Sequence, residues 1–356
     1  MATIQDVAQR AGVSVSTVSN VLNGRTDRMR RETLERVEAA IRALQFTPNK
    51  LAQQLKTGHT PLLGLLVPSM ANPMYGHIAR EVEAAAQEHY GHRLLIGSTY
   101  RDRDKEASFF DDLLAHGVRK VIVISSLSDE GHFEAAAARG MAVVSYDRRA
   151  TPGRRTRVSH VTPDNFEAAR LATQHLIDKG HRQLAFATVA GMTMSRSAKI
   201  AGFQAAADAA GLRKSARVID GGPLNEYGDS VIADVGRSIG AKLAAGGARP
   251  TGIVALNDLM AMGVMAGARD GGLQVPRDLS VVGIDGLFLF ALSDPPLTTV
   301  QLPVREMARA MVDEAMHRGP DAGSEEHERV FAPDGLIERG SVAALSARVA
   351  KTPVRR

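Results

Sequence analysis

The chain has 356 residues, no cysteine and a formal net charge of +5, a length that allows two or three domains with buried cores. The absence of cysteine excludes disulfide bonds and thiolate metal sites. The N-terminus is too charged for a signal peptide, and the most apolar stretch, residues 62–67, is too short to cross a bilayer. We therefore expect a cytoplasmic protein.

The positive charge is concentrated at the two ends of the chain. Residues 1–60 contain nine Lys/Arg and five Asp/Glu, and the last nine residues contain Arg348, Lys351, Arg355 and Arg356. A basic N-terminal module on a near-neutral body indicates a polyanionic partner.

Residues 1–46 have the apolar spacing of three short helices. The first, at about 4–11, begins with Thr3 and Asp6 at the spacing of a capping box and ends at Gly12. Ser14 is a favourable N-cap for the second helix. The third helix has one apolar stripe, formed by Leu34, Val37, Ile41 and Leu44. We expect an all-α domain over residues 1–47.

Pro48 interrupts this pattern, and residues 49–56 that follow are compatible with a helix of barely two turns. A helix this short is marginal alone in water. We expect it to fold only against a partner surface, within a linker over residues 48–60.

From residue 62 short apolar runs alternate with longer amphipathic ones, the pattern of parallel sheets covered by helices. The expected strands are 62–67, 93–97, 120–124, 142–146, 183–187, 252–256 and 279–284, and the expected helices include 78–88, 166–179, 199–210, 227–244 and 259–270. These strands are enough for two doubly wound sheets with a ligand cleft. After Gly340 we expect a disordered basic tail, 341–356.

Several motifs then point to one family. The stretches IQDVAQRAGVSVSTVSNVLN, from Ile4, and PNKLAQQL, from Pro48, resemble the helix-turn-helix and hinge helix of the lac/purine repressor family. Asn257–Ala261, Ser280–Asp285 and Pro296–Val300 resemble its effector-domain signatures. The motifs occur in the family's order over residues 3–340.

The resemblance implies a ligand-responsive transcription repressor of the α/β class. It implies an N-terminal helix-turn-helix domain with a hinge helix, then a periplasmic-binding-protein-like effector domain over 61–340. That domain would have two parallel-sheet subdomains, at about 61–162 with 291–325 and about 163–290 with 326–340. The implied partners are a near-palindromic operator DNA, a second copy of the chain, and a small effector such as a sugar or sugar acid.

By the same resemblance, the second helix lies in the major groove. Val15, Ser16 and Asn20 fall on base-reading positions; Asn20 suits adenine, and Val15 suits a thymine methyl. The candidates for phosphate contacts are Thr17, Ser19 and Asn23. A solvated helix face is the alternative for Ser16 and Asn20.

In the hinge, Asn49, Leu55 and Lys56 are implied DNA contacts, with Leu55 as a minor-groove wedge; ordinary packing is the alternative for Leu55. The basic stretch 26–32 departs from the family, with Arg30 near the start of the third helix in place of the usual Ser. Extra phosphate contacts and a solvated charge run are equally compatible with this stretch.

The effector positions implied by the resemblance follow predicted strands or begin helices, and they are Met74, Tyr75, Asp147, Arg148, Ser195, Lys199, Asn257 and Asp285. Carboxylates there suit the donor hydroxyls of a sugar. Relatives usually have Arg where Lys199 stands, and their aromatic lid falls near Pro223. Arg148 with Lys199 favours an anionic ligand; alternatively, Arg148 pairs with Asp147 or Asp285 and the ligand is neutral.

Two other classes of function remain to be weighed. A sugar-binding transport protein has no use for residues 1–58, and an enzyme on a doubly wound fold would need a catalytic constellation. Gly236–Gly240 fits the hydrolase pattern G-x-S-x-G but lies inside a predicted helix, where a nucleophile elbow cannot form. The eleven histidines show no paired zinc spacing. We expect no catalysis, metal or cofactor.

Overall fold

The computed structural model describes residues 2–22, 24–27, 29–46, 61–100, 102–125, 129–151, 153, 155–191, 193–222, 231–246, 249–318 and 328–345. The chain divides into two compact units, Met1–Thr60 and Pro61–Arg356. Each unit is considered by itself. The expected hinge stretch, 48–60, lies outside the described residues.

The first unit contains the three expected helices, α1 (Ile4–Ala11), α2 (Val15–Leu22) and α3 (Arg31–Ala43). The capping box at α1 is confirmed, because Asp6 N donates to Thr3 Oγ1 (3.2 Å) and Thr3 N donates to Asp6 Oδ2 (2.8 Å). Gly12 follows in the left-handed conformation. The buried core of the unit consists of Val7, Ala8, Ala11, Val18, Val37 and Ala40.

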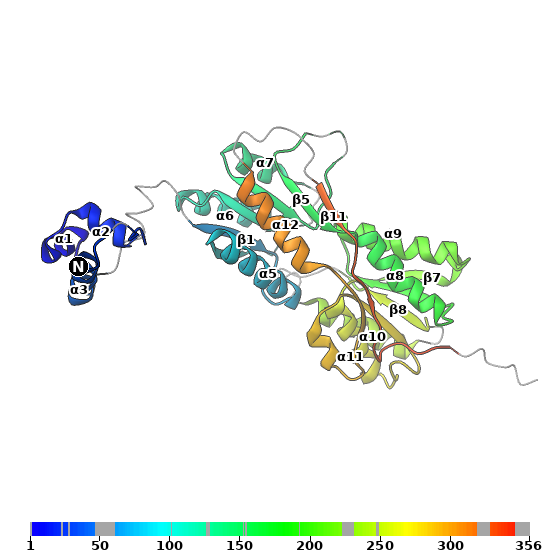
Figure 1. The fold of residues 1–356 in the computed structure, drawn as a ribbon. Helices are drawn as coiled ribbons and strands as arrows, with labels where there is room; N and C mark the ends of the chain where they lie inside the picture. Colours follow the sequence, from blue (N-terminus) through cyan, green and yellow to red (C-terminus); the bar gives the residue numbers. More distant parts are fainter. Residues whose placement is uncertain are drawn as a thin grey trace, which may run out of the picture. The chain divides into compact units, whose positions relative to one another are not determined.

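The second unit begins with a sheet that, within the described residues, has six parallel strands in the order β11-β5-β4-β3-β1-β2. Their bounds are β1 Leu62–Val67, β2 Arg93–Ser98, β3 Lys120–Ile124, β4 Ala142–Tyr146, β5 Ser159–Pro163 and β11 Glu328–Phe331. Helices α5 (Pro73–Tyr90) and α12 (Val304–His317) cover one face (Figure 1). Helices α6 (Arg103–Ala115) and α7 (Gly131–Ala138) cover the other.

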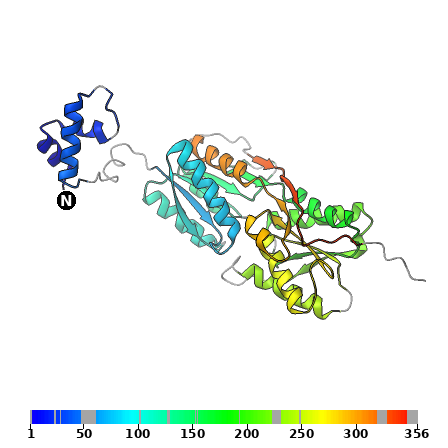
Figure 2. The same cartoon turned by 60° about the horizontal axis from the view of Figure 1, so that its bottom comes forward.

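The second sheet has the order β12-β10-β9-β8-β6-β7 over the part of the chain that the structure describes. Its strands are β6 Leu184–Thr188, β7 Ala216–Asp220, β8 Gly252–Ala255, β9 Ser280–Asp285, β10 Thr298–Gln301 and the antiparallel edge strand β12 Gly335–Ile337. Helices α8 (Asn165–Asp178) and α9 (Met194–Ala209) lie on one face, and α10 (Ile232–Ala245) and α11 (Asp258–Asp270) lie on the other (Figure 2). Two short 3-10 helices, η1 (Arg213–Ser215) and η3 (Phe288–Leu292), complete the described elements of this part. The expected two-sheet α/β architecture is confirmed.

The glycines of the G-x-S-x-G pattern serve helix packing. They lie inside α10, where a Cβ on Gly236 would stand 2.5 Å from Met260 O and one on Gly240 would stand 2.2 Å from Val264 O. Only glycine allows α10 and α11 to approach this closely. The motif therefore has a structural explanation that involves no nucleophile.

The points where the chain crosses between sheets differ from the expected boundaries. β10 belongs to the second sheet and α12 packs on the first, so one crossing lies near residue 302, where the resemblance placed it near 290. β11 pairs with β5 of the first sheet, so residues 328–331 belong there and the next crossing follows them. The remaining crossing in the described chain lies between β5 and α8, close to the expected position.

The prediction of a disordered tail from residue 341 is wrong for its first residues. Ser341 is fully buried; its Oγ donates to Val281 O (2.6 Å) and accepts from Thr298 N (2.8 Å). Leu345 N donates to Lys179 O (2.8 Å). The Ala/Ser-rich composition did not indicate these contacts, because small side chains occur both in disordered segments and in chain that packs against a sheet. Residues 346–356 lie outside the described residues.

Candidate functional site

Helix α2 presents the side chains expected to read DNA. Val15, Ser16 and Asn20 are exposed, whereas Val18, on the opposite face, is completely buried. Thr17 and Ser19 are half-buried. The apolar side of α2 therefore fixes which residues face outward, and Val15 remains 43% exposed despite being apolar. Asn23, Asn49, Leu55 and Lys56 lie outside the described residues.

Ser14 organises the start of α2. Its Oγ accepts from Thr17 N (3.2 Å) and lies 2.7 Å from Ser16 Oγ and 2.9 Å from Thr17 Oγ1. The expected cap is therefore present. The contact with Ser14 holds the Ser16 hydroxyl in a defined position on the exposed face of the helix.

The basic stretch before α3 is solvated where the structure describes it. Arg30 occupies the N-cap position of α3 with no side-chain cap among the described residues. Arg31 Nε lies 3.0 Å from Glu35 Oε1, and both side chains are largely exposed. Such a pair contributes little to stability. Because their side chains are exposed, Arg30 and Arg31 are accessible to an anionic partner.

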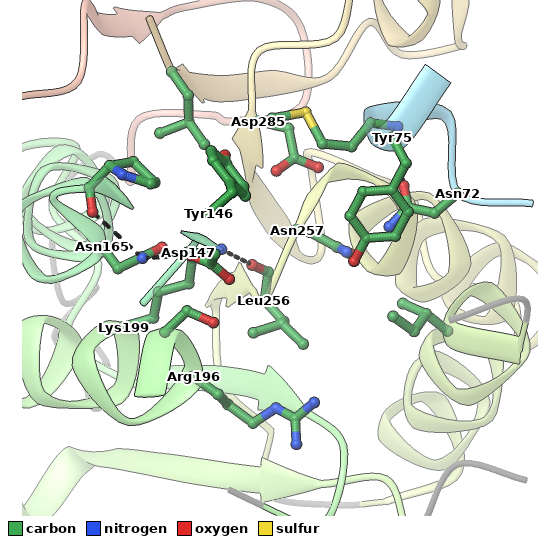
Figure 3. Close-up of a pocket in the computed structure, with 15 residues that line it drawn as sticks. Asn72, Tyr75, Tyr146, Asp147, Asn165, Arg196, Lys199, Leu256, Asn257 and Asp285 are labelled. Carbon is green, nitrogen blue, oxygen red and sulfur yellow. Dashed lines mark hydrogen bonds between the residues drawn. The ribbon is translucent and has the colours of Figure 1, made fainter. Parts of the chain in front are cut away.

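In the second unit a pocket lies between the carboxyl ends of the two sheets (Figure 3). Seven of the expected effector residues line it, and they are Met74, Tyr75, Asp147, Ser195, Lys199, Asn257 and Asp285. The other lining residues are Asn72, Tyr146, Pro163, Asn165, Arg196, Ile232, Leu256 and Leu302. The pocket thus draws on both sheets at the edge where doubly wound folds bind ligands.

Two asparagines in the pocket wall are helix caps. Asn72 Oδ1 accepts from Met74 N (3.0 Å) at the start of α5, and Asn257 Oδ1 accepts from Met260 N (2.9 Å) at the start of α11. Capping fixes each amide in one orientation. The pocket therefore presents preset polar groups in addition to its charged ones.

Asp147 is held by its backbone and by a side-chain partner. It follows β4 with φ of 65°, a left-handed conformation that is unfavourable for a non-glycine residue. Its Oδ1 accepts from Asn165 Nδ2 (2.8 Å). This bond joins the end of β4 to the start of α8, which packs on the other sheet.

Both cations in the pocket wall bind backbone carbonyls. Lys199 Nζ donates to Leu256 O (3.1 Å), and Arg196 Nη1 donates to Ala190 O (3.1 Å) and to Gly191 O. Each side chain is more than nine-tenths buried. These hydrogen bonds to carbonyl oxygens partly compensate the positive charges of Lys199 and Arg196. The two side chains therefore fix the shape of the pocket wall and also contribute to its electrostatic potential.

Asp285 and its neighbour Asp258 form a buried carboxylate pair. Asp258 Oδ2 accepts from Leu287 N (2.9 Å) and Oδ1 accepts from Thr299 Oγ1 (2.5 Å). Burial, then the charge of Asp258, raises the pKa of Asp285 well above its usual range, and burial also raises the pKa of Asp258. Within the described residues Asp285 Oδ2 has no hydrogen-bond partner. That atom is the one a ligand would satisfy.

The structure places Arg148 outside the pocket. Its guanidinium Nη2 lies 3.1 Å from Glu130 Oε2 at the start of α7, and both side chains are almost fully buried. Neither expected partner, Asp147 or Asp285, takes this role. The position of Arg148 after the end of β4 does not show which way its side chain turns, because that direction depends on Glu130 at the start of α7.

Sequence reasoning missed Tyr146, Asn165 and Arg196. Tyr146 precedes Asp147 at the end of a predicted strand, and that adjacency could have indicated it. Asn165 follows β5, whose sequence SHVTP is too polar to indicate a strand although all five residues are buried. In the described residues no group of three or more His, Cys, Asp or Glu could hold a metal ion.

Comparison with known families identifies both units. The sequence model described as "Bacterial regulatory proteins, lacI family" matches residues 3–49, and the one described as "Periplasmic binding protein-like domain" matches residues 173–342. The HTH-type transcriptional regulator DegA of Bacillus subtilis is 31% identical, over 97% of this chain and 99% of its own.

Solved structures agree with these matches. The lac repressor dimer bound to operator and the anti-inducer ONPF has a TM-score of 0.79 at 25% identity, covering 96% of this chain and 99% of that chain. The transcriptional regulator CelR in complex with cellobiose has a TM-score of 0.67 at 26% identity, covering 96% and 100%. Among the helices that the structure describes, none is long and apolar enough to cross a membrane.

Proposed function

Because the chain belongs to the lacI family of bacterial regulatory proteins, we propose that it is a transcription repressor switched by a neutral, hydroxyl-rich effector of the sugar class. The effector binds between the two sheets of the second unit. The single observation that carries this proposal is the pocket, where Asp147 and Asp285 offer acceptor oxygens from opposite sheets.

A sugar suits this pocket better than an anion. Its hydroxyls can donate to carboxyl oxygens, and Asp285 Oδ2 is a buried oxygen with no hydrogen-bond partner among the described residues. Arg148, one of the two cations that favoured an anionic ligand, is paired with Glu130 instead. The two cations that do line the pocket bind backbone carbonyls.

A ligand that bridges the two sheets can act as a switch. It binds the closed arrangement of the sheets more tightly than the open one, and only this difference in affinity can change the population of DNA-binding molecules. The direction of the response, induction or corepression, is an outcome of the experiment below.

The DNA half of the proposal rests on α2. We assign base contacts to Val15, Ser16 and Asn20, and phosphate contacts to Thr17 and Ser19. The exposed face formed by the first three residues supports this assignment. Regulation of transcription by a bound small molecule needs no catalysis. It requires contact with the bacterial DNA, so we place the chain in the cytoplasm.

A dimer follows from the exposed apolar residues of the second unit. Helix η3 leaves Phe288 78% exposed and Leu292 80% exposed, and the edge strand β2 leaves Leu95 and Ile96 exposed. Exposed apolar side chains such as these are typical of interaction surfaces. A second copy of the chain would cover them and bring two α2 helices to a two-fold symmetric operator.

The test combines selection of DNA with a screen of effectors. The full chain would select duplexes from a random library, and their affinities would then be measured with and without a panel of mono- and disaccharides. We expect a near-palindromic site and at least one sugar that changes its affinity tenfold or more. Failure to enrich any sequence would refute the DNA half, and an enriched site that no sugar affects would refute the effector half.

A further inference from the structure

We propose that the second sheet carries a second ligand site at the amino ends of its strands, and that this site takes a small phosphorylated metabolite. The site is the hollow beside Arg217 and Arg249. It lies at the opposite edge of the sheet from the effector pocket, whose residues Asn257 and Asp285 stand at the carboxyl ends of β8 and β9. The inference goes beyond the proposed function, and neither depends on the other.

Three neighbouring strands bring the walls of the hollow together. β8, β6 and β7 are adjacent in the sheet and run parallel, so their amino ends share one edge. Gln183 precedes β6, Lys214 precedes β7, and Arg249 lies in the segment before β8. The sheet thus gathers around one hollow residues that are far apart in the sequence.

The hollow has the size of a small-molecule site. Its volume is about 380 Å³, within the range of about 300–1,000 Å³ that is usual for ligand pockets. Leu184 and Pro250 make part of its wall apolar, and Gln183 and Ser215 add an amide and a hydroxyl. There is therefore room for an organic group as well as for an anion.

The charged residues that line the hollow are all cations, and they are Lys214, Arg217 and Arg249. Over the residues that the structure describes, none of the three forms an ion pair or a side-chain hydrogen bond. Elsewhere in this unit an exposed arginine can have an acidic partner, as Arg237 has in Asp270 (2.7 Å). Three positive charges without such a partner around one hollow favour an anionic ligand.

The acidic group that Arg249 influences does not neutralise it. The pKa of Asp278 is lowered first by the hydrogen bond from Gln274 N, then by Arg277, and last by the charge of Arg249. The Asp278 carboxylate accepts from Gln274 N (2.9 Å) and from Arg277 Nη2 (3.2 Å), and it does not line the hollow. Its charge is therefore directed to its own loop.

The end of the chain adds positive charge at the same edge of the sheet. Leu345 N donates to Lys179 O (2.8 Å), in the segment that leads from α8 into β6. The sequence then continues with residues 346–356, which contain four Lys/Arg and no Asp/Glu. The following sequence thus offers the hollow no negative charge.

A phosphate suits these cations better than a carboxylate does. The guanidinium of an arginine donates two parallel hydrogen bonds to the oxygens of a phosphate, and a lysine adds a point charge. A phosphate monoester carries about 1.5 to 2 negative charges at pH 7, whereas a carboxylate carries a single charge. The backbone of a nucleic acid is followed by a continuous basic groove, whereas these cations surround a single hollow.

The experiment measures by calorimetry the binding of glycerol, glycerate and glycerol 3-phosphate to the full chain at low ionic strength, where exposed charges are least screened. The three compounds present a hydroxyl, a carboxylate and a phosphate on similar small frames, and none has a sugar ring to occupy the effector pocket. The variants are Arg217→Gln, Arg249→Gln and the two combined. Arg213→Gln is the matched control, because the Arg213 side chain is 86% exposed, next to Lys214, and does not line the hollow.

We expect glycerol 3-phosphate to bind at least about tenfold more tightly than glycerate, and glycerol not to bind. Each single variant should weaken the binding of glycerol 3-phosphate about tenfold, the effect of a hydrogen bond to a charged group. The combined variant should abolish it, and Arg213→Gln should stay within twofold. Thermal melting checks the fold of each variant.

Several results would overturn the inference. They are no binding of glycerol 3-phosphate, equal binding of glycerate, an affinity that the Arg217 and Arg249 variants leave unchanged, and an equal loss in Arg213→Gln. A short random duplex tests the nucleic-acid alternative, and the natural chain and the combined variant should bind it equally. A weaker duplex affinity in the combined variant would make this edge a DNA contact and would also overturn the inference. All of these outcomes leave the sugar-dependent switch to its own test.

Discussion

The exposed face of α2 and the effector pocket are formed in different ways. On α2 the candidate residues Val15, Ser16 and Asn20 lie within six positions of one helix and face outward. In the pocket the candidates come from segments between Asn72 and Leu302, and most of them are buried. One face is set by local periodicity, whereas the other exists only after two sheets have formed.

This difference determines what a substitution can report. An exposed side chain on α2 has few contacts in its own unit, so its removal should change DNA affinity with little effect on folding. A buried polar side chain near the pocket supports the fold as well as the ligand. A substitution on α2 can therefore change DNA affinity without changing stability. At the pocket, a control variant is needed to distinguish an effect on ligand binding from an effect on folding.

The largest effect should come from breaking the Arg148–Glu130 pair. Glu130→Ala leaves a nearly inaccessible guanidinium without this partner, so we expect a loss of about 3–5 kcal/mol in the free energy of unfolding. Urea denaturation of the full chain measures this loss. A loss below about 1 kcal/mol would show that the pair contributes little.

A double variant then tests whether Arg148 also contacts the effector. Arg148→Met with Glu130→Leu replaces the pair by apolar residues, a change that is often tolerated in a buried site. We expect the free energy of unfolding to recover and sugar affinity to stay close to that of the natural chain. A stable double variant that had lost its sugar affinity would return Arg148 to the ligand site.

The next largest effect concerns Asp285. Asp285→Asn keeps the size of the side chain but replaces one acceptor oxygen, and we expect sugar affinity to fall by about 2 kcal/mol, or thirtyfold. DNA affinity without sugar should remain unchanged. Asp270→Asn is the control, since Asp270 is an exposed partner of Arg237 outside the pocket. Calorimetry that gave the same affinity for both variants would exclude Asp285 from the site.

A smaller effect is expected at α2. Asn20→Ala should weaken binding to the selected operator by about 1–3 kcal/mol and relax the preference at one base pair. The free energy of unfolding should change little, because Asn20 is exposed. Fluorescence anisotropy on operator and random duplexes gives both affinities. An equal loss on the two duplexes would assign Asn20 to the phosphates.

The same contrast explains how much of the molecule could be predicted from sequence. α1 and the strands at 62–67, 120–124 and 142–146 have the predicted bounds, because their apolar periodicity is strong and their ends carry caps or turns. Seven of the eight effector positions line the pocket. Those positions came from a family resemblance, and strand ends alone would have indicated only the edge of the sheet.

What escaped prediction depends on distant contacts. β5 is polar and β11 is half exposed, and each becomes a strand through its neighbours in the sheet. Arg148 and Arg196 are both arginines near the cleft, yet one pairs with Glu130 and the other lines the pocket. No local pattern distinguishes them, because the distinction depends on the position of α7.

The smallest effect should be the dependence of the natural chain's stability on mildly acidic pH, since two kinds of buried group titrate in opposite directions. Burial, then the charge of Arg148, lowers the pKa of His160 from 6.5 to about 4. Between these values the unfolded chain takes up a proton that the folded chain does not, so acidification lowers the free energy of unfolding. The raised pKa values of Asp258 and Asp285 act in the opposite sense, because the folded chain then binds protons before the unfolded one does.

Two variants separate these opposing contributions. In His160→Gln the histidine contribution is removed, so the free energy of unfolding should rise, relative to the natural chain, as the pH falls from 6.5 to 4. In Asp258→Asn one of the raised carboxyl groups is removed, so it should fall over the same range. Urea midpoints at pH 7, 6, 5 and 4 measure both slopes. If both variants gave pH profiles parallel to that of the natural chain, neither group would titrate as its burial requires. That result would also remove the electrostatic basis for pairing Asp258 with Asp285 at the ligand site.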